Sequence, residues 1–462
     1  MIGNRFLFKM KNNTPQRIFS TATEPKKHLI CILALSLFFL NICRAQHNEF
    51  HSVDSLFSYV SSKSITLQSD EIRIGQAKKA RLAAILSVPD MSGNLSFNYT
   101  NNTKLPVNLF PASVFGGQDG TFVPIQTGIP FVSTGNENID VKLINLKGWE
   151  NLKLSKLNIQ KSIADKKLTV KILYEDIAST YYNIVSLQQQ LSSTEKNLQS
   201  AENLLQITTN KYAGGLIKQQ DVNEAKISSL DTRENYNQIK YQIQQQYLVL
   251  KILCDFPEDE QITIQDLQDS LFSEKVKVGL SRVGIENSEL KESVALSNYR
   301  QQKYALYPTL SFFQSYTTQQ NNTRSRLFDS NVDWINSSYI GLKLSIPIPS
   351  SSTMRQISEA NHNYLLAQKD TEQQKIKAGI EQRQLEIDYY KALSQISSYG
   401  EVAQLRKENY EKNLSLYQEG LIELQKVLNS YDDMVNSIYN LVSAQVSASA
   451  AKTKIHINNT IR

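Results

Sequence analysis

The chain has 462 residues, and its 50 Lys and Arg against 44 Asp and Glu give a formal net charge of +6. Seven of the basic residues and one acidic residue lie in residues 1–45, so the remainder holds 43 of each and is neutral. The charge therefore gives no indication of nucleic acid as a partner. After residue 45 no window approaches about 18 consecutive apolar residues, so we expect no transmembrane helix there.

Residues 1–45 have the features of a secretory signal peptide. Basic residues precede an apolar run of 12 residues, Leu29–Leu40, which is too short to span a bilayer comfortably. A small-x-small cleavage pattern at residues 43–45 follows, so we expect the mature chain to begin at Gln46. The alternatives are a membrane anchor and a lipoprotein with a lipidated Cys43, but the residues before Cys43 fit the second alternative poorly.

Long polar helices are predicted over most of the remaining sequence. Residues 149–210 contain no Gly or Pro, and a helix over that span is about 90 Å long at about 1.5 Å per residue. Residues 354–416 repeat this character, with only two glycines. In both stretches apolar residues recur in a narrow stripe, which is typical of coiled-coil packing. A compact globular domain is too small to accommodate helices of this length.

The two long stretches end in the same short sequence. Residues 212–225 read YAGGLIKQQDVNEA and residues 417–430 read YQEGLIELQKVLNS, about 205 positions later. Each copy lies between helix-forming stretches, so each is predicted to be the bend of a helical hairpin. A chain built from two copies of one hairpin can place them symmetrically around an axis.

The return legs of these hairpins are shorter than the first legs. They cover about 219–253 and 424–457, and Cys254 at the end of the first is expected to be a small buried residue. A short helix over about 288–306 nearly makes up the missing length in the first copy. From lengths alone, we expect an N-terminal helix over about 64–86 to do the same in the second copy.

Two pairs of strands with alternating apolar residues are predicted between the short and the long helices. The apolar sets are Ile139, Val141 and Leu143 in the first copy, and Ile340, Leu342, Leu344 and Ile346 in the second. A soluble, half-buried sheet gives the same pattern. The predicted signal peptide and the two long helices favour strands that face lipid on one side and water on the other.

Four strands cannot close a barrel, and an open sheet is excluded in hydrocarbon because its edge groups lack hydrogen-bond partners. We therefore expect three copies to form a 12-stranded β-barrel. The loops over about 101–137 and 318–336 would then face outside the cell.

The expected architecture is mainly α, with duplicated long helical hairpins forming an α-barrel tunnel and a small transmembrane β part. The first repeat covers residues 46–307 and the second covers 308–462. Expected elements of the first repeat are strands over about 92–101 and 138–147, a hairpin over 149–254, an equatorial segment over 255–287 and a short helix. Those of the second are strands over about 308–317 and 338–347 and a hairpin over 353–457.

Over residues 50–457 the chain resembles the TolC-type outer-membrane efflux and secretion channels. The resemblance rests on the duplicated Tyr-x-x-Gly bend followed by Val, on Pro89 and Pro308 at the start of each first strand, and on the segment SIPIP at 345–349. It implies a homotrimer in the outer membrane of a Gram-negative bacterium, in contact with outer-membrane lipid and with its helical part in the periplasm. It also implies a passive channel without cofactor or enzymatic activity, served by a periplasmic adaptor and an inner-membrane pump of the RND, ABC or MFS type.

The resemblance assigns the two bends to the periplasmic mouth, where the adaptor binds. The implied contact residues are Gly214, Gly215, Leu216, Ile217, Gly420, Leu421 and Ile422. Glycine permits a tight turn and the close approach of a partner to the backbone, and the apolar pair offers a small exposed apolar surface for binding. The alternative for Gly215 and Gly420, the glycines that match between the two copies, is that they only end helices.

The resemblance also implies gate residues, and here the chain departs from the family pattern. Tyr417 and Asp221 occupy the positions of a polar tie that holds the mouth closed. The basic partner in that tie falls on Ile422. Two acidic positions that ring the mouth in some members fall on Lys426 and Asn429, and Asp432 and Asp433 one turn later are the remaining acidic candidates.

Two other classes of function fit the sequence less well. A periplasmic adaptor or coiled-coil scaffold is also exported and rich in hairpins, but two hairpins with paired amphipathic strands fit it poorly. For an enzyme, none of the histidines after residue 45 lies beside a Gly-rich nucleophile turn. His47 and His51 could ligate a metal from one helical face, but the sequence HNEFH lacks the zincin order. The exported substrate is not indicated by the sequence.

Overall fold

The computed structural model describes residues 47–265 and 276–461, and the predicted leader, cleavage site and Cys43 lie outside these ranges. Two compact units are present. The small unit includes residues 47–48 and Asp259–Thr263, and the large unit comprises Glu49–Glu258 and Ile264–Arg462. Strands β1 (His47–Phe50) and β6 (Gln261–Ile264) pair as a two-stranded sheet.

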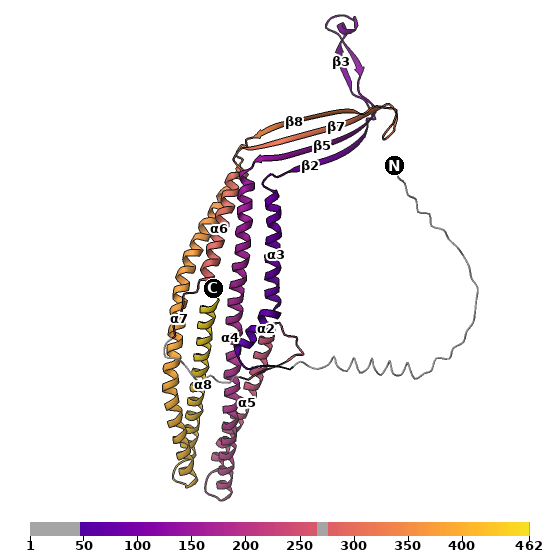
Figure 1. Cartoon of the computed structure of the whole chain (residues 1–462). Coiled ribbons are helices and arrows are strands. Elements are labelled where there is room, and N and C mark those ends of the chain that lie inside the picture. Colours follow the sequence, from indigo (N-terminus) through magenta and orange to yellow (C-terminus); the bar gives the residue numbers. More distant parts are fainter. Residues whose placement is uncertain (1–46, 266–275, 462) are drawn as a thin grey trace, which may run out of the picture. The chain divides into compact units, whose positions relative to one another are not determined.

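Two helices of 68 residues dominate the large unit, α4 (Leu146–Ala213) and α7 (Ser351–Gln418). Each is about 100 Å long at about 1.5 Å per residue. The return helices are α5 (Gln219–Cys254) and α8 (Leu424–Thr460), so the two predicted hairpins are present (Figure 1). None of the helices in the described ranges contains an apolar stretch long enough to cross a membrane.

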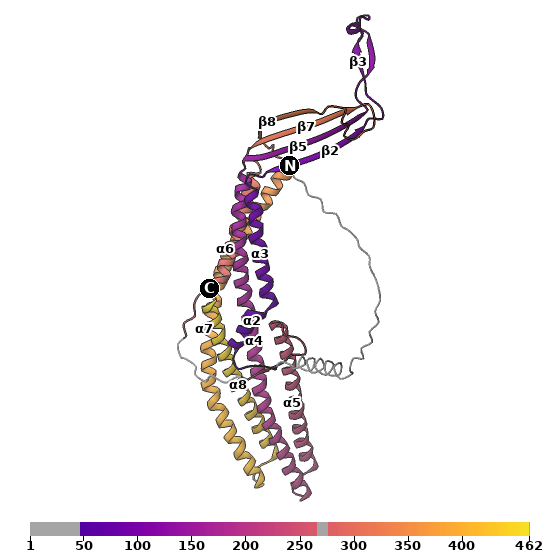
Figure 2. The ribbon, with the colours of Figure 1, turned by 45° about the vertical axis from the view of Figure 1, so that its right-hand side comes forward.

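Each short helix extends one of the two return helices, but the pairing is the opposite of the one expected from helix lengths. Helix α3 (Ile65–Leu86), which follows the 11-residue helix α2 (Val53–Lys63) in the chain, continues the line of α5 along α4. Helix α6 (Val283–Tyr304) continues the line of α8 along α7 (Figures 1 and 2). The expectation that the N-terminal helix completes the second copy is therefore wrong. Both short helices have 22 residues, so length could not distinguish between the two pairings.

Hydrogen bonds fix both end-to-end joints. At the first, the carboxylate of Asp255 accepts from Ser64 Oγ at 3.0 Å and from Ile65 N at 2.9 Å. At the second, Asn458 Nδ2 donates to Gly279 O at 2.6 Å, and Gly279 N donates to Asn459 Oδ1 at 2.8 Å. Helix α5 ends at Asp255, whose left-handed φ of 57° does not continue the helix.

We expect Asp255→Ala to lower the free energy of unfolding by about 2–4 kcal/mol, because it removes the acceptor for two donors and places alanine in a left-handed conformation. Asp255→Asn is the matched control, since asparagine tolerates that conformation and retains an acceptor oxygen. Chemical denaturation of the purified protein, followed by circular dichroism, measures the difference. Equal stability of the two variants would contradict the assigned role of this joint.

The main sheet has four antiparallel strands in the order β2-β5-β7-β8. They are β2 (Ser92–Asn101), β5 (Phe131–Ile144), β7 (Thr309–Asn322) and β8 (Ile335–Ser345). All four predicted strands are present, but β5 and β7 reach 14 residues each, because their polar outer halves pair with one another as far as Phe131 and Asn322. Strands β2 and β8 are the two edges.

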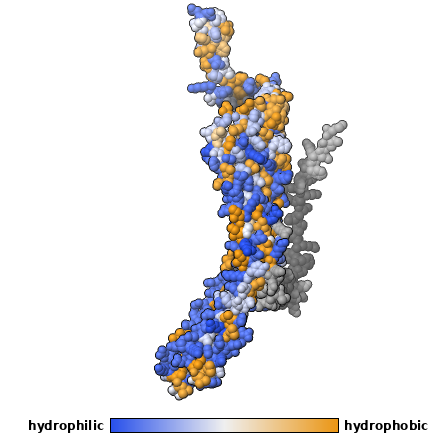
Figure 3. Space-filling model, turned by 90° about the vertical axis from the view of Figure 1, so that its left-hand side faces the viewer, coloured by the Kyte–Doolittle hydropathy of each residue, from blue (hydrophilic) through white to orange (hydrophobic). Residues whose placement is uncertain are grey.

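The register gives the sheet one apolar and one polar face. Val141 lies opposite Phe312, and Phe312 lies opposite Leu342, so these three side chains form one apolar row across the sheet. On the other face Ser315 Oγ donates to Asn138 Oδ1 at 2.8 Å. Leu342 remains 67% exposed, as do most apolar side chains of this face (Figure 3).

A small hairpin interrupts the segment 101–137, which was expected to be a loop. It consists of β3 (Val107–Pro111), the 3₁₀ turn η1 (Ala112–Phe115) and β4 (Phe122–Gln126). Gly116 and Gly120, both with positive φ, lie between two apolar runs that pair. The proline content of this segment obscured the strands, because proline is tolerated in hairpins whose edges are free.

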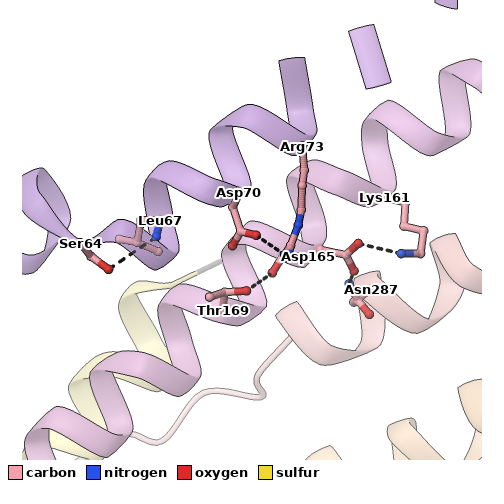
Figure 4. Close-up of polar contacts among 8 residues, drawn as sticks. All are labelled: Ser64, Leu67, Asp70, Arg73, Lys161, Asp165, Thr169 and Asn287. Carbon is pink, nitrogen blue, oxygen red and sulfur yellow. Dashed lines mark hydrogen bonds and ion pairs between the residues drawn. The ribbon is translucent and has the colours of Figure 1, made fainter. Parts of the chain in front are cut away.

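Polar side chains gather where α4 packs against α3 and α6, and one hydrogen bond among them joins α4 to α6 (Figure 4). The carboxylate of Asp165 on α4 accepts from Lys161 Nζ at 2.7 Å and from Asn287 Nδ2 at 2.6 Å. Burial acts to raise the pKa of Asp165, but the hydrogen bonds from Lys161 and Asn287 outweigh it and the pKa lies below its ordinary value. Asp70 on α3 pairs with Arg73 at 2.9 Å, and its other carboxylate oxygen is buried without a donor among the described residues.

Candidate functional site at the two helical bends

The two repeated sequences form bends with the same backbone hydrogen bonds. After α4, Gly215 N donates to Tyr212 O at 2.9 Å and Leu216 N donates to Lys211 O at 2.9 Å. After α7, Gly420 N donates to Tyr417 O at 3.0 Å and Leu421 N donates to Leu416 O at 2.9 Å. These pairs of bonds are Schellman motifs, in which the residues after the helix donate to backbone carbonyls that have no partner within the helix.

Glycine is required at one position in each bend. Gly215 has φ 70° and Gly420 has φ 80°, a left-handed conformation that costs other residues about 1–2 kcal/mol. A Cβ atom at either position would meet no atom within 4 Å. The role of both glycines in ending helices is thus confirmed, and the space beside them is open in the single chain. Gly214, by contrast, has an ordinary φ of −81°.

The apolar pairs after the glycines divide into exposed and packed residues. Leu216 is 74% exposed and Leu421 is 65% exposed. Ile217 and Ile422 are half-buried, and Ile422 packs against the core between the two hairpins. Of the four predicted apolar contact residues, the two leucines therefore present the accessible surface.

A buried core joins the two bends to each other, so both lie at the same end of the helical layer. It draws on α4, α5, α7 and α8. Its buried members are Ala201, Leu204, Ala225, Tyr410, Tyr417, Leu424, Val427, Leu428, Tyr431 and Met434. Tyr431 adds a cross-hairpin hydrogen bond, donating from its hydroxyl to Asn197 O at 2.7 Å. The two hairpins of one chain are thereby held together near their tips.

The matched tyrosines of the repeat have different environments. Tyr212 is 44% exposed, whereas Tyr417 is 3% exposed and lies in the core. Burial raises the pKa of Tyr417, an effect that the nearby Thr208 hydroxyl opposes and the charge of Asp221 reinforces. Thr208 donates its own hydrogen bond to Leu204 O, and the Tyr417 hydroxyl has no hydrogen bond of acceptable geometry among the described residues.

Lys211 is a contact that the sequence reasoning missed. Its Nζ lies 4.2 Å from the centroid of the Tyr417 ring and donates a hydrogen bond to Tyr417 O, at the end of α7. The residue that matches Lys211 in the second copy is Leu416. A comparison of the two copies for differences, instead of identities, would have singled out this lysine. Lys211 is thus a positively charged side chain in direct contact with Tyr417, whereas the position of Ile422 carries none.

The other gate candidates are not gathered into one polar cluster. Asp221 accepts from Lys218 N at 3.1 Å and so caps the start of α5. Lys426 and Asn429 are exposed on α8, where Asn429 accepts from Gln425 Nε2 at 2.9 Å.

The acidic pair one turn later is also partly engaged. Asp433 forms an ion pair with Arg406. Partial burial and the charge of Asp433 raise the pKa of Asp432. No group of three or more His, Cys, Asp or Glu side chains in the described part of the chain is arranged to hold a metal ion.

Part of the chain matches a known protein family. Residues 137–253 match the family model described as outer membrane efflux protein. No curated protein sequence matches the chain.

Solved structures match nearly the whole fold. The outer membrane protein VceC from Vibrio cholerae has a TM-score of 0.72 at 18% identity, over 88% of this chain and 95% of that chain. The outer-membrane channel OprN has a TM-score of 0.73 at 14% identity, over 88% and 89%. The Campylobacter jejuni CmeC outer membrane channel has a TM-score of 0.66 at 17% identity, over 88% and 85%. At these identities the likeness shows a shared fold.

Proposed function

Because residues 137–253 match the outer membrane efflux protein family and solved outer-membrane channels share the fold, we propose that three copies form a passive exit duct in the outer membrane, with the helical part in the periplasm. The substrate is driven by an inner-membrane pump of the RND, ABC or MFS type and passes through a periplasmic adaptor into the helical tunnel. The duct performs no bond chemistry and needs no cofactor.

The open four-stranded sheet is the observation that carries this proposal. Its edge strands β2 and β8 have no partner on their outer sides among the described residues, and its apolar face is exposed. In hydrocarbon each unpaired backbone group costs several kcal/mol, so the edges require partners. Pairing β2 of one copy with β8 of the next closes a ring of twelve strands around a polar interior.

Exposed apolar side chains on the helices support the same assembly. Ile72 on α3 is 72% exposed, Ile252 on α5 is 77% exposed, and Ile376 on α7 is 66% exposed. Helices α3 and α5 pack on α4, and α7 packs on α6 and α8. Neighbouring copies would bury these stripes, because helices with narrow apolar seams pack against other helices.

The bends are proposed to form the periplasmic mouth. Leu216 and Leu421 offer the accessible apolar contacts for the adaptor, with Gly214, Gly215, Gly420 and the half-buried Ile217 and Ile422 shaping the surface around them. Tyr417 and Lys211, with Asp221 nearby, tie the two bends of each chain in the closed state. A periplasmic adaptor or scaffold is less well supported, since it leaves the apolar face of the sheet without a partner.

Fractionation of cells that express the full chain tests the assembly. We expect the protein in the outer-membrane fraction, migrating on a denaturing gel as a trimer before heating and as a monomer after heating. Such heat-modifiable migration follows from a sheet that is closed between copies. A monomer recovered from the soluble periplasmic fraction would rule out the duct and favour a scaffold.

A further inference from the structure

The β3–β4 hairpin is apolar on both faces. Pairing places Leu109 opposite Pro124 and Phe110 opposite Val123, so successive side chains point to opposite faces and both faces carry large apolar groups. Leu109 is 65% exposed and Phe122 is 61% exposed on one face. Phe110 and Val123, on the other face, are each more than one third exposed. The 3₁₀ turn adds Val114 and Phe115, which are also exposed.

No other part of the described chain covers this hairpin. Strand β3 packs substantially only against β4 and η1, and the apolar residues stand out in the space-filling view (Figure 3). Residues 106–130 contain one charged side chain, Asp119. An isolated two-stranded hairpin is only marginally stable in water, and a hairpin with two apolar faces needs cover on both. The near absence of charge disfavours a polyelectrolyte or a charged headgroup as that cover.

Hydrogen bonds connect the base of the hairpin directly to the main sheet. Asn102 N donates to Pro130 O at 2.7 Å, and its side chain donates to Ile129 O at 2.8 Å. Thr127 N donates to Pro106 O at 2.9 Å. The β3–β4 hairpin is a separate two-stranded sheet, and these hydrogen bonds tie the two short connections at its base to each other beyond the last pair of the β2–β5 ladder. The hairpin starts beside the edge at which the proposed duct pairs with its neighbour.

Threefold symmetry brings three such hairpins to one end of the duct. Twelve strands about 4.8 Å apart and tilted by about 40° enclose a ring with a radius of about 12 Å. A strand of five residues is about 17 Å long, so each hairpin is long enough to reach the threefold axis. A hairpin in a ring of three has one neighbour on each side, which matches its two apolar faces.

We propose that the β3–β4 hairpin of each chain packs against the same hairpin of two other copies and forms an apolar collar at the outer mouth. This inference rests on the proposed trimer. The occupant of each apolar face is a second copy of this chain. The collar narrows the outer end of the duct, at the opposite end of the fold from the two bends.

Cysteine cross-linking of the full chain in outer membranes tests the collar. The native Cys254 is a suitable background, because it is fully buried and burial, with the charge of Asp255, raises its pKa to about 12. We expect Val114→Cys to form disulfide-linked dimers on oxidation with copper phenanthroline. At most about two thirds of the chains can be linked, since three single cysteines form only one pair. Leu109→Cys provides a second position within the same collar, should Val114→Cys fold poorly.

Thr323→Cys is the matched control, an exposed residue in the other strand-connecting loop. We expect it to remain unlinked and to react several times faster with a membrane-impermeant maleimide than Val114→Cys. If a heat-modifiable trimer forms but Val114→Cys and Leu109→Cys stay unlinked, the collar is wrong and the duct stands. Protection of Val114→Cys from maleimide without linking would assign the cover to lipid and also overturn the collar. If no trimer forms, both proposals fail.

Discussion

Replacing Gly215 or Gly420 by leucine is expected to abolish export while leaving membrane insertion and trimer formation intact. Both glycines have a left-handed backbone that costs leucine about 1–2 kcal/mol, which a folded protein of this size can absorb. A Cβ atom at either position meets no atom of its own chain, so the new side chain projects into open space. That space is where the proposed adaptor approaches. Efflux assays and heat-modifiable migration of each variant measure the two effects separately.

Asparagine at the same positions separates helix ending from adaptor binding. It tolerates the left-handed conformation and can end a helix, but its side chain still blocks close approach. We therefore expect Gly215→Asn and Gly420→Asn to fold with near-native stability and to lose export. Gly379→Asn, inside α7 and far from the bends along the chain, is the control for a general effect. Normal export by the two asparagine variants would show that these glycines only end helices.

Replacing Lys211 by methionine is expected to open the periplasmic mouth. The lysine makes a cation–π contact with Tyr417 and a charged hydrogen bond to its carbonyl, which together contribute roughly 2–4 kcal/mol to joining the bends. Loss of about 1.4 kcal/mol from the closed state shifts an equilibrium about tenfold. We therefore expect at least about a tenfold increase in channel opening, measured as conductance in planar bilayers.

Two further substitutions control this experiment. Lys226→Met removes a nearby exposed lysine of α5 and should leave the conductance unchanged. Lys211→Arg keeps the positive charge and the contact with the ring, and should retain most of the closed state. If Lys211→Met and Lys226→Met give the same conductance as the parent chain, Lys211 has no part in holding the mouth closed.

The hairpins, the bends and the four strands could be predicted because their signals are local. A stretch without Gly or Pro and with a helical apolar stripe has few alternatives to a helix, and Gly215 and Gly420 mark its end by backbone conformation alone. Alternation in Ile340, Leu342 and Leu344 likewise follows from the geometry of a single strand. The duplication then related the two halves of the chain without any knowledge of their packing.

Contacts between distant segments could not be predicted in the same way. The joint of α3 with α5 depends on the turn at Asp255, and two short helices of equal length gave no means of choosing between them. The apolar hairpin within residues 101–137 was hidden by its prolines, since its strands are defined by pairing with each other.

By itself, the sequence determined the repeated helical bends, their glycines and the amphipathic strands, because backbone conformation and side-chain periodicity are properties of neighbouring residues. Only the tertiary structure decided that Tyr417 is buried while Tyr212 is exposed, and that Lys211 of one hairpin reaches Tyr417 of the other. These two residues are 206 positions apart and meet because α4 and α7 have equal lengths and end side by side. No local sequence pattern encodes which face of each helix packs against the other.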